Sequence, residues 1–141
     1  MTWKSHNAVT FITIFALTHD FTASFAGMAG SVFPDKIEGP LWRHWHRKYS
    51  HWFVMYLPWV LLLWYKGLPT QGLFYKGLFW FLIGALMHIV EDAICGTIPL
   101  WNPRKKKEVL PRLFYTGSVK ESLYVTCYFI VMLILSFKNI Y

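Results

Sequence analysis

Histidine and carboxylate side chains stand in three short stretches of an otherwise apolar sequence. WRHWHRKYSH (42–51) carries three histidines, GSVFPD (30–35) ends in an aspartate, and HIVED (88–92) places a histidine four residues before an aspartate. Neutral imidazoles and carboxylates are ligands that zinc and other divalent ions of hard or intermediate character accept. These residue types predict a metal site, for which the rest of the chain acts as the scaffold.

The HIVED stretch has the spacing of a helical ligand pair. Residues four apart lie on one face of a helix, so His88 and Asp92 can hold one ion together. Glu91 points about 60° away from His88, which makes it a less well placed ligand or base. Ionisable groups within an apolar helix are costly and mark functional sites by default. The alternative is a buried structural hydrogen bond between His88 and Asp92.

The other candidate ligands precede that helix. His46 and His51 are five residues apart, a spacing that suits a loop bending around an ion, whereas His44 is expected to be a solvated loop histidine. Asp35 follows a proline, and its alternative role is an ordinary helix N-cap. His6 is a weak candidate alone and gains weight only if the chain folds back to bring it beside Asp35.

Composition favours an integral membrane protein over a soluble domain with a large core. The chain of 141 residues is 55% hydrophobic, 20% aromatic and 15% charged, against roughly 25% charged residues in ordinary soluble domains. Its aromatic residues gather at the ends of apolar runs, as in the belts at membrane interfaces. The net charge of +7 comes mostly from two basic runs, within 43–48 and 104–107. They indicate cytoplasmic loops that contact anionic headgroups. Nucleic-acid binding is the weaker interpretation because no stacking platform accompanies the basic residues.

The first apolar region, residues 7–32, is either one spanning helix or a short helical hairpin that turns near Thr18–Asp20. The hairpin is favoured because Thr18 or Asp20 can cap the second limb and the turn returns His6 to Asp35. Small residues in 23–30 would let that limb pack closely against a neighbour.

Three further apolar stretches follow. Residues 52–65 are too short to span comfortably and contain Pro58, residues 78–98 are the best spanning candidate, and residues 122–137 form a final helix. Pro34 is expected to end the second limb, with 35–51 as a basic loop or interfacial helix, 66–76 as a turn and 102–120 as a second basic loop. The predicted fold is all-α, a small helical membrane bundle that forms one domain over residues 1–141.

The motifs together resemble a known family. In order they are His6, GSVFPD (30–35), HRKYSH (46–51), HIVED (88–92) and GTIPLWNP (96–103). Their order and spacing resemble the membrane-bound metal-dependent hydrolases of the LexA-regulated inner-membrane type, which are distantly similar to zinc-dependent phospholipase C and single-strand nucleases. The resemblance covers residues 5–103 and leaves 104–141 as a basic loop and a C-terminal membrane helix. It implies these metal ligands: His6, Asp35, His46, His51, His88 and Asp92.

The resulting hypothesis is a hydrolase that uses one or two Zn²⁺ ions, or Mn²⁺, to cleave a phosphodiester such as a lipid headgroup at the cytoplasmic interface. Asp35 or Glu91 would accept the proton of water, and Arg47 or Lys48 would neutralise a phosphate oxygen. One alternative is a non-catalytic membrane subunit with a structural ion or polar cluster. Another is a proton or metal transporter that uses His19, Asp20, His88 and Asp92.

The same features predict the surroundings of the protein. We expect a multi-pass protein of a bacterial inner membrane, encoded by the bacterium or by a phage, with its basic loops in the cytoplasm. The expected partners are membrane lipids, with anionic headgroups at the basic loops. A homo-oligomer or a larger membrane complex is compatible with the sequence.

Overall fold

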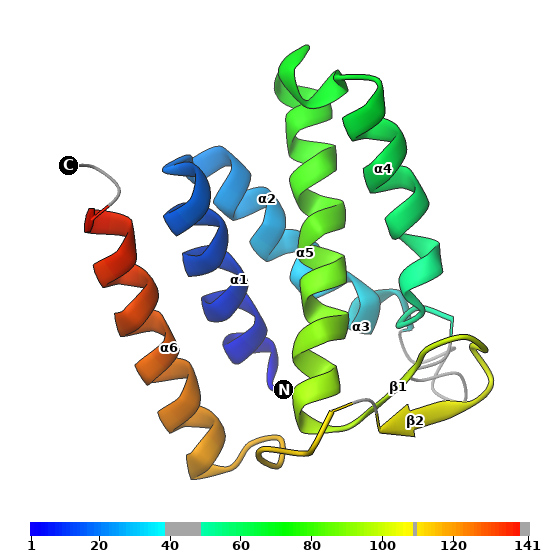
Figure 1. Cartoon of the computed structure of the whole chain (residues 1–141), viewed down its shortest axis with the longest axis vertical. Coiled ribbons are helices and arrows are strands. Elements are labelled where there is room, and N and C mark those ends of the chain that lie inside the picture. Colours follow the sequence, from blue (N-terminus) through cyan, green and yellow to red (C-terminus); the bar gives the residue numbers. More distant parts are fainter. Residues whose placement is uncertain (39–48, 109, 139–141) are drawn as a thin grey trace.

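The computed structural model describes residues 1–38, 49–108 and 110–138. In the described part the chain is a helical bundle in which α5 (Leu73–Cys95) runs through the centre (Figure 1). The helices α1, α2 and α6 stand on one side of α5, and α4 stands on the other (Figure 1). This arrangement confirms the predicted all-α fold.

The N-terminal hairpin is confirmed. Helix α1 (Trp3–Thr18) and helix α2 (Phe21–Ser31) are joined by a tight turn, in which His19 adopts a left-handed φ of 50°. Asp20 caps α2 because its side chain accepts a hydrogen bond from the backbone N–H of Ala23. The turn lies at the upper end of the bundle in Figure 1, so the chain returns downward along α2. Asp35 therefore comes to lie beside the start of α1, where it accepts a hydrogen bond of 2.8 Å from the indole of Trp3.

Pro34 begins a helix, whereas the sequence predicted that it would end one. Helix α2 already ends at Ser31, and the short helix α3 (Phe33–Glu38) follows with Pro34 in its first turn. Proline suits that position because the N–H it lacks would have no partner within the helix. The first part of the expected loop or interfacial helix at 35–51 is therefore helical.

Pro58 behaves in the same way. A short 3₁₀ helix (Phe53–Met55) leads into α4 (Leu57–Tyr65), and Pro58 stands in the first turn of α4, where it causes no kink. As expected from its length, α4 is too short to span a bilayer, since nine residues rise only about 14 Å. A second 3₁₀ helix (Leu68–Thr70) connects α4 to α5. The central helix begins at Leu73, before the predicted start at residue 78. The expected turn at 66–76 is therefore shorter than predicted.

The closest helix contact is between α2 and α5, and glycines create it. A Cβ atom added to Gly84 would lie 1.9 Å from the carbonyl oxygen of Gly27, and one added to Gly30 would lie 1.9 Å from that of Phe81. The two main chains therefore touch directly, as the small residues of the second limb predicted. Because α3 and Asp35 follow α2, this contact fixes their position against α5.

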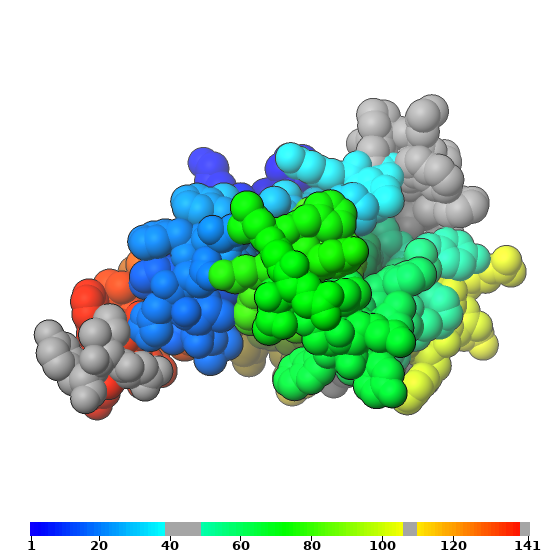
Figure 2. Space-filling view, turned by 90° about the horizontal axis from the view of Figure 1, so that it is seen from above, coloured from blue at the N-terminus to red at the C-terminus, as the bar shows by residue number. Residues whose placement is uncertain are grey.

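Two strands follow α5 where the sequence predicted a helix end and a loop. Strand β1 (Thr97–Pro99) pairs antiparallel with β2 (Lys106–Glu108), with Ile98 opposite Lys107. The indole of Trp52 donates to the carbonyl of Leu100, which joins this hairpin to the segment before α4. The hairpin and α6 lie at opposite ends of the molecule when it is viewed from above (Figure 2).

Helix α6 (Val119–Lys138) confirms the predicted C-terminal helix and packs on α1. The hydroxyls of Thr13 and Tyr128 form a hydrogen bond of 2.8 Å between the two helices. In the described residues, α5 and α6 are long and apolar enough to cross a membrane, with hydropathies of 1.7 and 1.5. Much of α6 is exposed, as expected of a helix that faces lipid.

Candidate metal centre

Histidine and aspartate side chains from four parts of the chain meet at the lower end of the bundle. They come from the start of α1, from α3, from the segment before α4 and from the last turns of α5 (Figure 1). The three histidines among them are fully buried, and one of the two aspartates is 1% exposed. The residues are His6, Asp35, His51, His88 and Asp92.

Four atoms of this group form a compact cluster. The Nε2 atoms of His51 and His88 lie 3.0 Å apart. Asp35 Oδ1 lies 3.2 Å from the first nitrogen and 3.6 Å from the second. Asp92 Oδ2 lies 3.5 Å and 3.7 Å from the same two atoms. These five separations are close to the value of about 3.3 Å expected between ligand atoms that share a tetrahedral ion with bonds of about 2.0 Å. The ligand atoms fall into groups of three within 4.8 Å of one another, and the group that holds Asp35 consists of Asp35, His51 and His88.

The atoms of this cluster have too few protons to form hydrogen bonds with one another, which favours a cation at its centre. His51 Nδ1 lies 3.1 Å from Glu38 Oε1, and since a carboxylate only accepts, His51 in its neutral form carries its proton on Nδ1. Its Nε2 then presents a lone pair to the two aspartate oxygens and to the other imidazole. If both imidazoles are neutral, the only proton that can lie between these four nitrogen and oxygen atoms is one on Nε2 of His88. Extra protons or a metal ion must offset their mutual repulsion.

Two residues outside the cluster orient His51. Glu38 is buried, and Ser50 donates its hydroxyl to the same carboxylate oxygen that accepts from the imidazole. The hydroxyl of Tyr56 in turn donates to the carbonyl of Ser50 at 2.8 Å. Carboxylates that bond the far nitrogen of a ligand histidine fix its tautomer and raise its basicity. Glu38 has that position with respect to His51.

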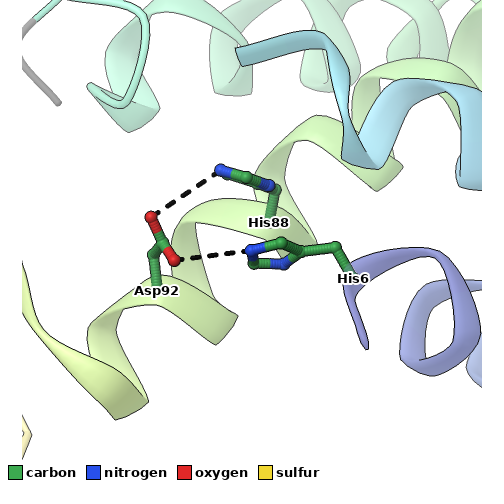
Figure 3. A group of neighbouring side chains, drawn as sticks. All are labelled: His6, His88 and Asp92. Carbon is green, nitrogen blue, oxygen red and sulfur yellow. Dashed lines mark ion pairs between the residues drawn. The ribbon is translucent and has the colours of Figure 1, made fainter. Parts of the chain in front are cut away.

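His6 has an equivalent partner. Its Nδ1 is hydrogen-bonded to Glu91, whose other oxygen accepts from the hydroxyl of Thr10 at 3.1 Å. Its Nε2 lies 3.4 Å from Asp92 Oδ1. His6, His88 and Asp92 thus form a second group of adjacent ligand atoms, in which Asp92 faces both histidines (Figure 3). Asp92 joins the two groups because each of its oxygens faces a different one.

Asp35 is the most accessible member, with 16% of its side chain exposed. Its other oxygen accepts a hydrogen bond of 2.8 Å from the indole of Trp3, an exposed contact that links α1 to α3. Burial alone would raise the pKa of Asp35, but the adjacent imidazoles of His51 and His88, in their protonated forms, outweigh it and hold the pKa below its usual range. Burial would likewise lower the pKa of His51, and its bonds to Asp35 and Glu38 raise it instead.

The last turns of α5 add to the attraction for a cation. His88 and Asp92 lie on one face, as their spacing of four predicts, close to the carboxyl end of the helix at Cys95. Unpaired carbonyl groups make that end of a helix partly negative. Asp92 Oδ1 also accepts a hydrogen bond of 2.7 Å from the amino nitrogen of Met1. The partly negative end of α5 thus lies beside the carboxylate of Asp92, and both favour a cation.

Three residues predicted for the site, His46, Arg47 and Lys48, lie outside the described residues, as does His44. Glu91, predicted as a ligand or a base, contacts His6 and Thr10 and is 4% exposed.

The residues of the transporter alternative lie at two ends of the bundle. His19 contacts the hydroxyl of Ser136 at the upper end, and Asp20 forms an ion pair with Lys76 there. The thirteen residues from His6 to His19 correspond to about 20 Å of helical rise. A relay that joins these groups to His88 and Asp92 therefore needs bridging groups along the length of α1.

Sequence reasoning missed Glu38. The signal was available, because Glu38 follows Asp35 by three residues, and residues at this spacing share a face of a helix. Because the sequence predicts that Pro34 ends a helix, Glu38 falls in an expected loop. The helix α3 instead presents both carboxylates to His51, one as a candidate ligand and one as its orienting partner.

Comparison with known proteins identifies the family of this chain. The profile of the YdjM inner membrane protein family matches residues 1–140, including α6. No curated protein and no solved structure matches the chain. The family description names a location, the inner membrane, which supports a bacterial inner-membrane protein and agrees with the two apolar helices α5 and α6. The chain belongs to the YdjM inner membrane protein family.

Proposed function

We propose that this inner-membrane protein is a metal-dependent hydrolase that cleaves a phosphodiester at the bilayer surface, such as the headgroup of a lipid. The observation that carries the proposal is a pair of imidazole nitrogens 3.0 Å apart, with one oxygen of Asp35 and one of Asp92 each lying 3.2 to 3.7 Å from both nitrogens. We further propose that the protein crosses the membrane more than once and that its basic loops and this centre face the cytoplasm.

The donor set fits a divalent ion. Two imidazoles and two carboxylates at these separations suit Zn²⁺, with Mn²⁺ as the alternative because it accepts carboxylate oxygens readily. His51, His88 and Asp35 would hold one ion, and the group of His6, His88 and Asp92 would serve a second. Glu38 accepts from Nδ1 of His51 and Glu91 accepts from Nδ1 of His6, so Nε2 of each ring faces the ligand groups.

The residues of the chain have distinct proposed roles. A bound divalent ion would supply Lewis-acid activation of water and of a phosphoryl oxygen. Asp35, the most exposed of the five, would accept a proton from the attacking water. Glu91 is held by His6 and Thr10, so we assign it the positioning of His6. Arg47 and Lys48 are close to His51 in sequence and would neutralise a phosphate oxygen of the substrate.

The test combines metal analysis with hydrolysis by the purified full-length protein. Wild-type protein should contain about one or two zinc ions per chain and release phosphate esters from vesicles of phosphatidylglycerol. His88→Ala should lose both properties. His19→Ala, at the opposite end of the bundle, is the matched control and should keep both. The proposal is wrong if His88→Ala retains the metal content and the hydrolytic activity of the wild type.

A second candidate function is a non-catalytic membrane component with a structural ion. It is favoured by one observation: the two imidazole nitrogens are adjoined by two carboxylates, those of Asp35 and Asp92, which makes four protein side chains in all. Structural zinc sites are closed by four protein ligands, whereas catalytic sites keep a position for water. Substitution with Co²⁺ distinguishes the two, because its visible spectrum responds to an added anion only where a coordination position is open. A spectrum that azide leaves unchanged, together with absent hydrolysis, would favour the structural role.

A further inference from the structure

A mainly apolar pocket of about 390 Å³ lies beside the metal centre, and the proposed chemistry does not explain it. Its apolar lining comes from three parts of the chain: Phe33 and Ile37 of α3, Met55 just before α4 and Trp59 at its start, and Leu82 of α5. Its volume is within the range of about 300 to 1,000 Å³ that is usual for small-molecule sites. The pocket is therefore large enough to hold part of an elongated ligand.

The polar end of this pocket leads to the metal centre. Glu38 and Ser50 are part of its lining. Both also contact His51 Nδ1, at 3.1 Å from the carboxylate and 3.0 Å from the hydroxyl. One imidazole ring thus separates the polar end of the pocket from the cluster of ligand atoms. A ligand whose apolar part fills the pocket would bring its polar part close to the centre.

The open side of the pocket is apolar as well. Ile37, Met55 and Trp59 are 51%, 50% and 59% exposed, so the walls reach the surface of the protein. The outer face of α4 continues the apolar surface with Leu61 and Leu62. In a protein of the inner membrane, such a surface is covered by lipid, and a tryptophan at its edge is typical of the headgroup level. Acyl chains are therefore the apolar groups nearest to this pocket.

A positive charge lies at the polar rim. Tyr49 lines the pocket, and its hydroxyl accepts a hydrogen bond of 3.2 Å from Arg104 Nε. Arg104 stands in the turn between β1 and β2, is exposed, and is followed by the exposed Lys105. An exposed guanidinium and a nearby ammonium complement a phosphate group. The rim thus suits the anionic headgroup of a lipid whose chain enters between α3 and α4.

We propose that this pocket is an acyl-chain site for an anionic glycerophospholipid. One chain lies between α3 and α4, and the headgroup lies between Arg104 and the metal centre. The proposal names the substrate class of the hydrolase and rests on the proposed function in that respect only. Occupation of the pocket by the chain requires neither metal nor turnover.

The test is photolabelling of full-length protein in bilayer nanodiscs of phosphatidylcholine. The probe is phosphatidylglycerol with a diazirine in one acyl chain, and labelled peptides are located by mass spectrometry. Label should concentrate on residues 33–38 and 55–59. Ile37→Trp and, independently, Met55→Trp should fill the pocket and lower labelling of the other lining residues by about tenfold. Leu61→Trp, equally exposed on α4 but outside the pocket, is the matched control and should leave labelling unchanged.

A separate variant tests the contact between Arg104 and the headgroup. Arg104→Gln should lower labelling by the phosphatidylglycerol probe and leave labelling by the matching phosphatidylcholine probe unchanged. Even labelling of the exposed faces of α4 and α6 by the wild type would overturn the proposal, as would equal effects of Ile37→Trp, Met55→Trp and Leu61→Trp.

The two proposals fail separately. If His88→Ala loses metal and hydrolysis but keeps the label in the pocket, both stand. If the wild type proves to have neither metal nor activity yet retains the label, the acyl-chain site stands and the hydrolase does not. Hydrolysis without label in the pocket leads to the opposite conclusion.

Discussion

His51 and His88 direct their Nε2 atoms at one another across 3.0 Å, although they come from segments 37 residues apart. Glu38 holds the proton of a neutral His51 on its other nitrogen, so the facing atom offers a lone pair. Two imidazoles in this position either share a proton or share a metal ion. The two aspartate oxygens beside them favour a charge larger than that of one proton.

The outer partner of His51 should govern metal affinity. Glu38→Ala removes the carboxylate that fixes the tautomer of His51, and we expect the zinc dissociation constant to rise about 10- to 100-fold. Competition with a chromogenic chelator measures this change. Lys36→Ala, exposed on the same short helix, is the control and should bind zinc as the wild type does. Equal affinities of the two variants would show that Glu38 has no orienting role.

The glycine contact between α2 and α5 should be a determinant of stability. Gly84→Ala places a methyl group against the backbone of Gly27, and relief of that overlap should cost about 1 to 3 kcal/mol. Gly77→Ala on the same helix meets no atom within 4 Å and should be neutral or slightly stabilising. Thermal unfolding in detergent gives both values. A melting temperature of Gly84→Ala at or above that of Gly77→Ala would contradict the close packing.

The turn between α1 and α2 should make stability depend on pH. The hydrogen bond from Lys76, with help from the backbone N–H of Ala23, lowers the pKa of Asp20. A lowered pKa in the folded state means that the stabilisation is complete above the unfolded pKa of about 4 and is lost as pH falls below it.

Asp20→Asn keeps the helix cap and removes only the charge, so it isolates this effect. Its melting temperature should be below that of the wild type at pH 7, and the difference should shrink as the pH falls from 5 to 3. In a Lys76→Gln background the same substitution should have little effect at any pH. A difference that stays constant with pH would exclude the ion pair as its cause.

Glu121 should stabilise the packing of the start of α1 against α6. It is 1% exposed and accepts hydrogen bonds from the backbone N–H groups of Thr2 and Gly117 at 2.7 and 2.6 Å. Glu121→Ala leaves both donors without this acceptor and should destabilise the protein by about 1.5 to 3 kcal/mol. Denaturation in mixed micelles measures the loss. Lys120→Ala, its exposed neighbour, should change stability little, and a similar loss in both variants would count against the interaction.

Much of the bundle could be predicted from local signals. The cap at Asp20, the small residues of α2 and the spacing of His88 and Asp92 each report on contacts within one or two turns. They were enough to predict the hairpin, the central helix and the face that carries the two ligands on α5. These signals need no knowledge of which distant segment packs against them.

The remaining features depend on context that local patterns do not contain. Pro34 and Pro58 can end one helix or begin the next, and the choice depends on where the preceding segment stops packing. Ile98 pairs with Lys107, nine residues away, and the basic residues around Lys107 are more typical of a loop than of a strand. The role of Glu38 followed from α3, so the error over Pro34 concealed it.

The contact of main chain on main chain at Gly27 and Gly84 bears on how the protein responds to its membrane. Bilayers thin and thicken with temperature and composition, and embedded helices tilt to follow them. Helices separated by long side chains can slide as those side chains change rotamer, whereas backbones in direct contact turn as one piece. Asp35 follows α2 and Asp92 belongs to α5, so the two carboxylates are expected to move together. Their spacing is thereby insulated from the thickness of the membrane around them.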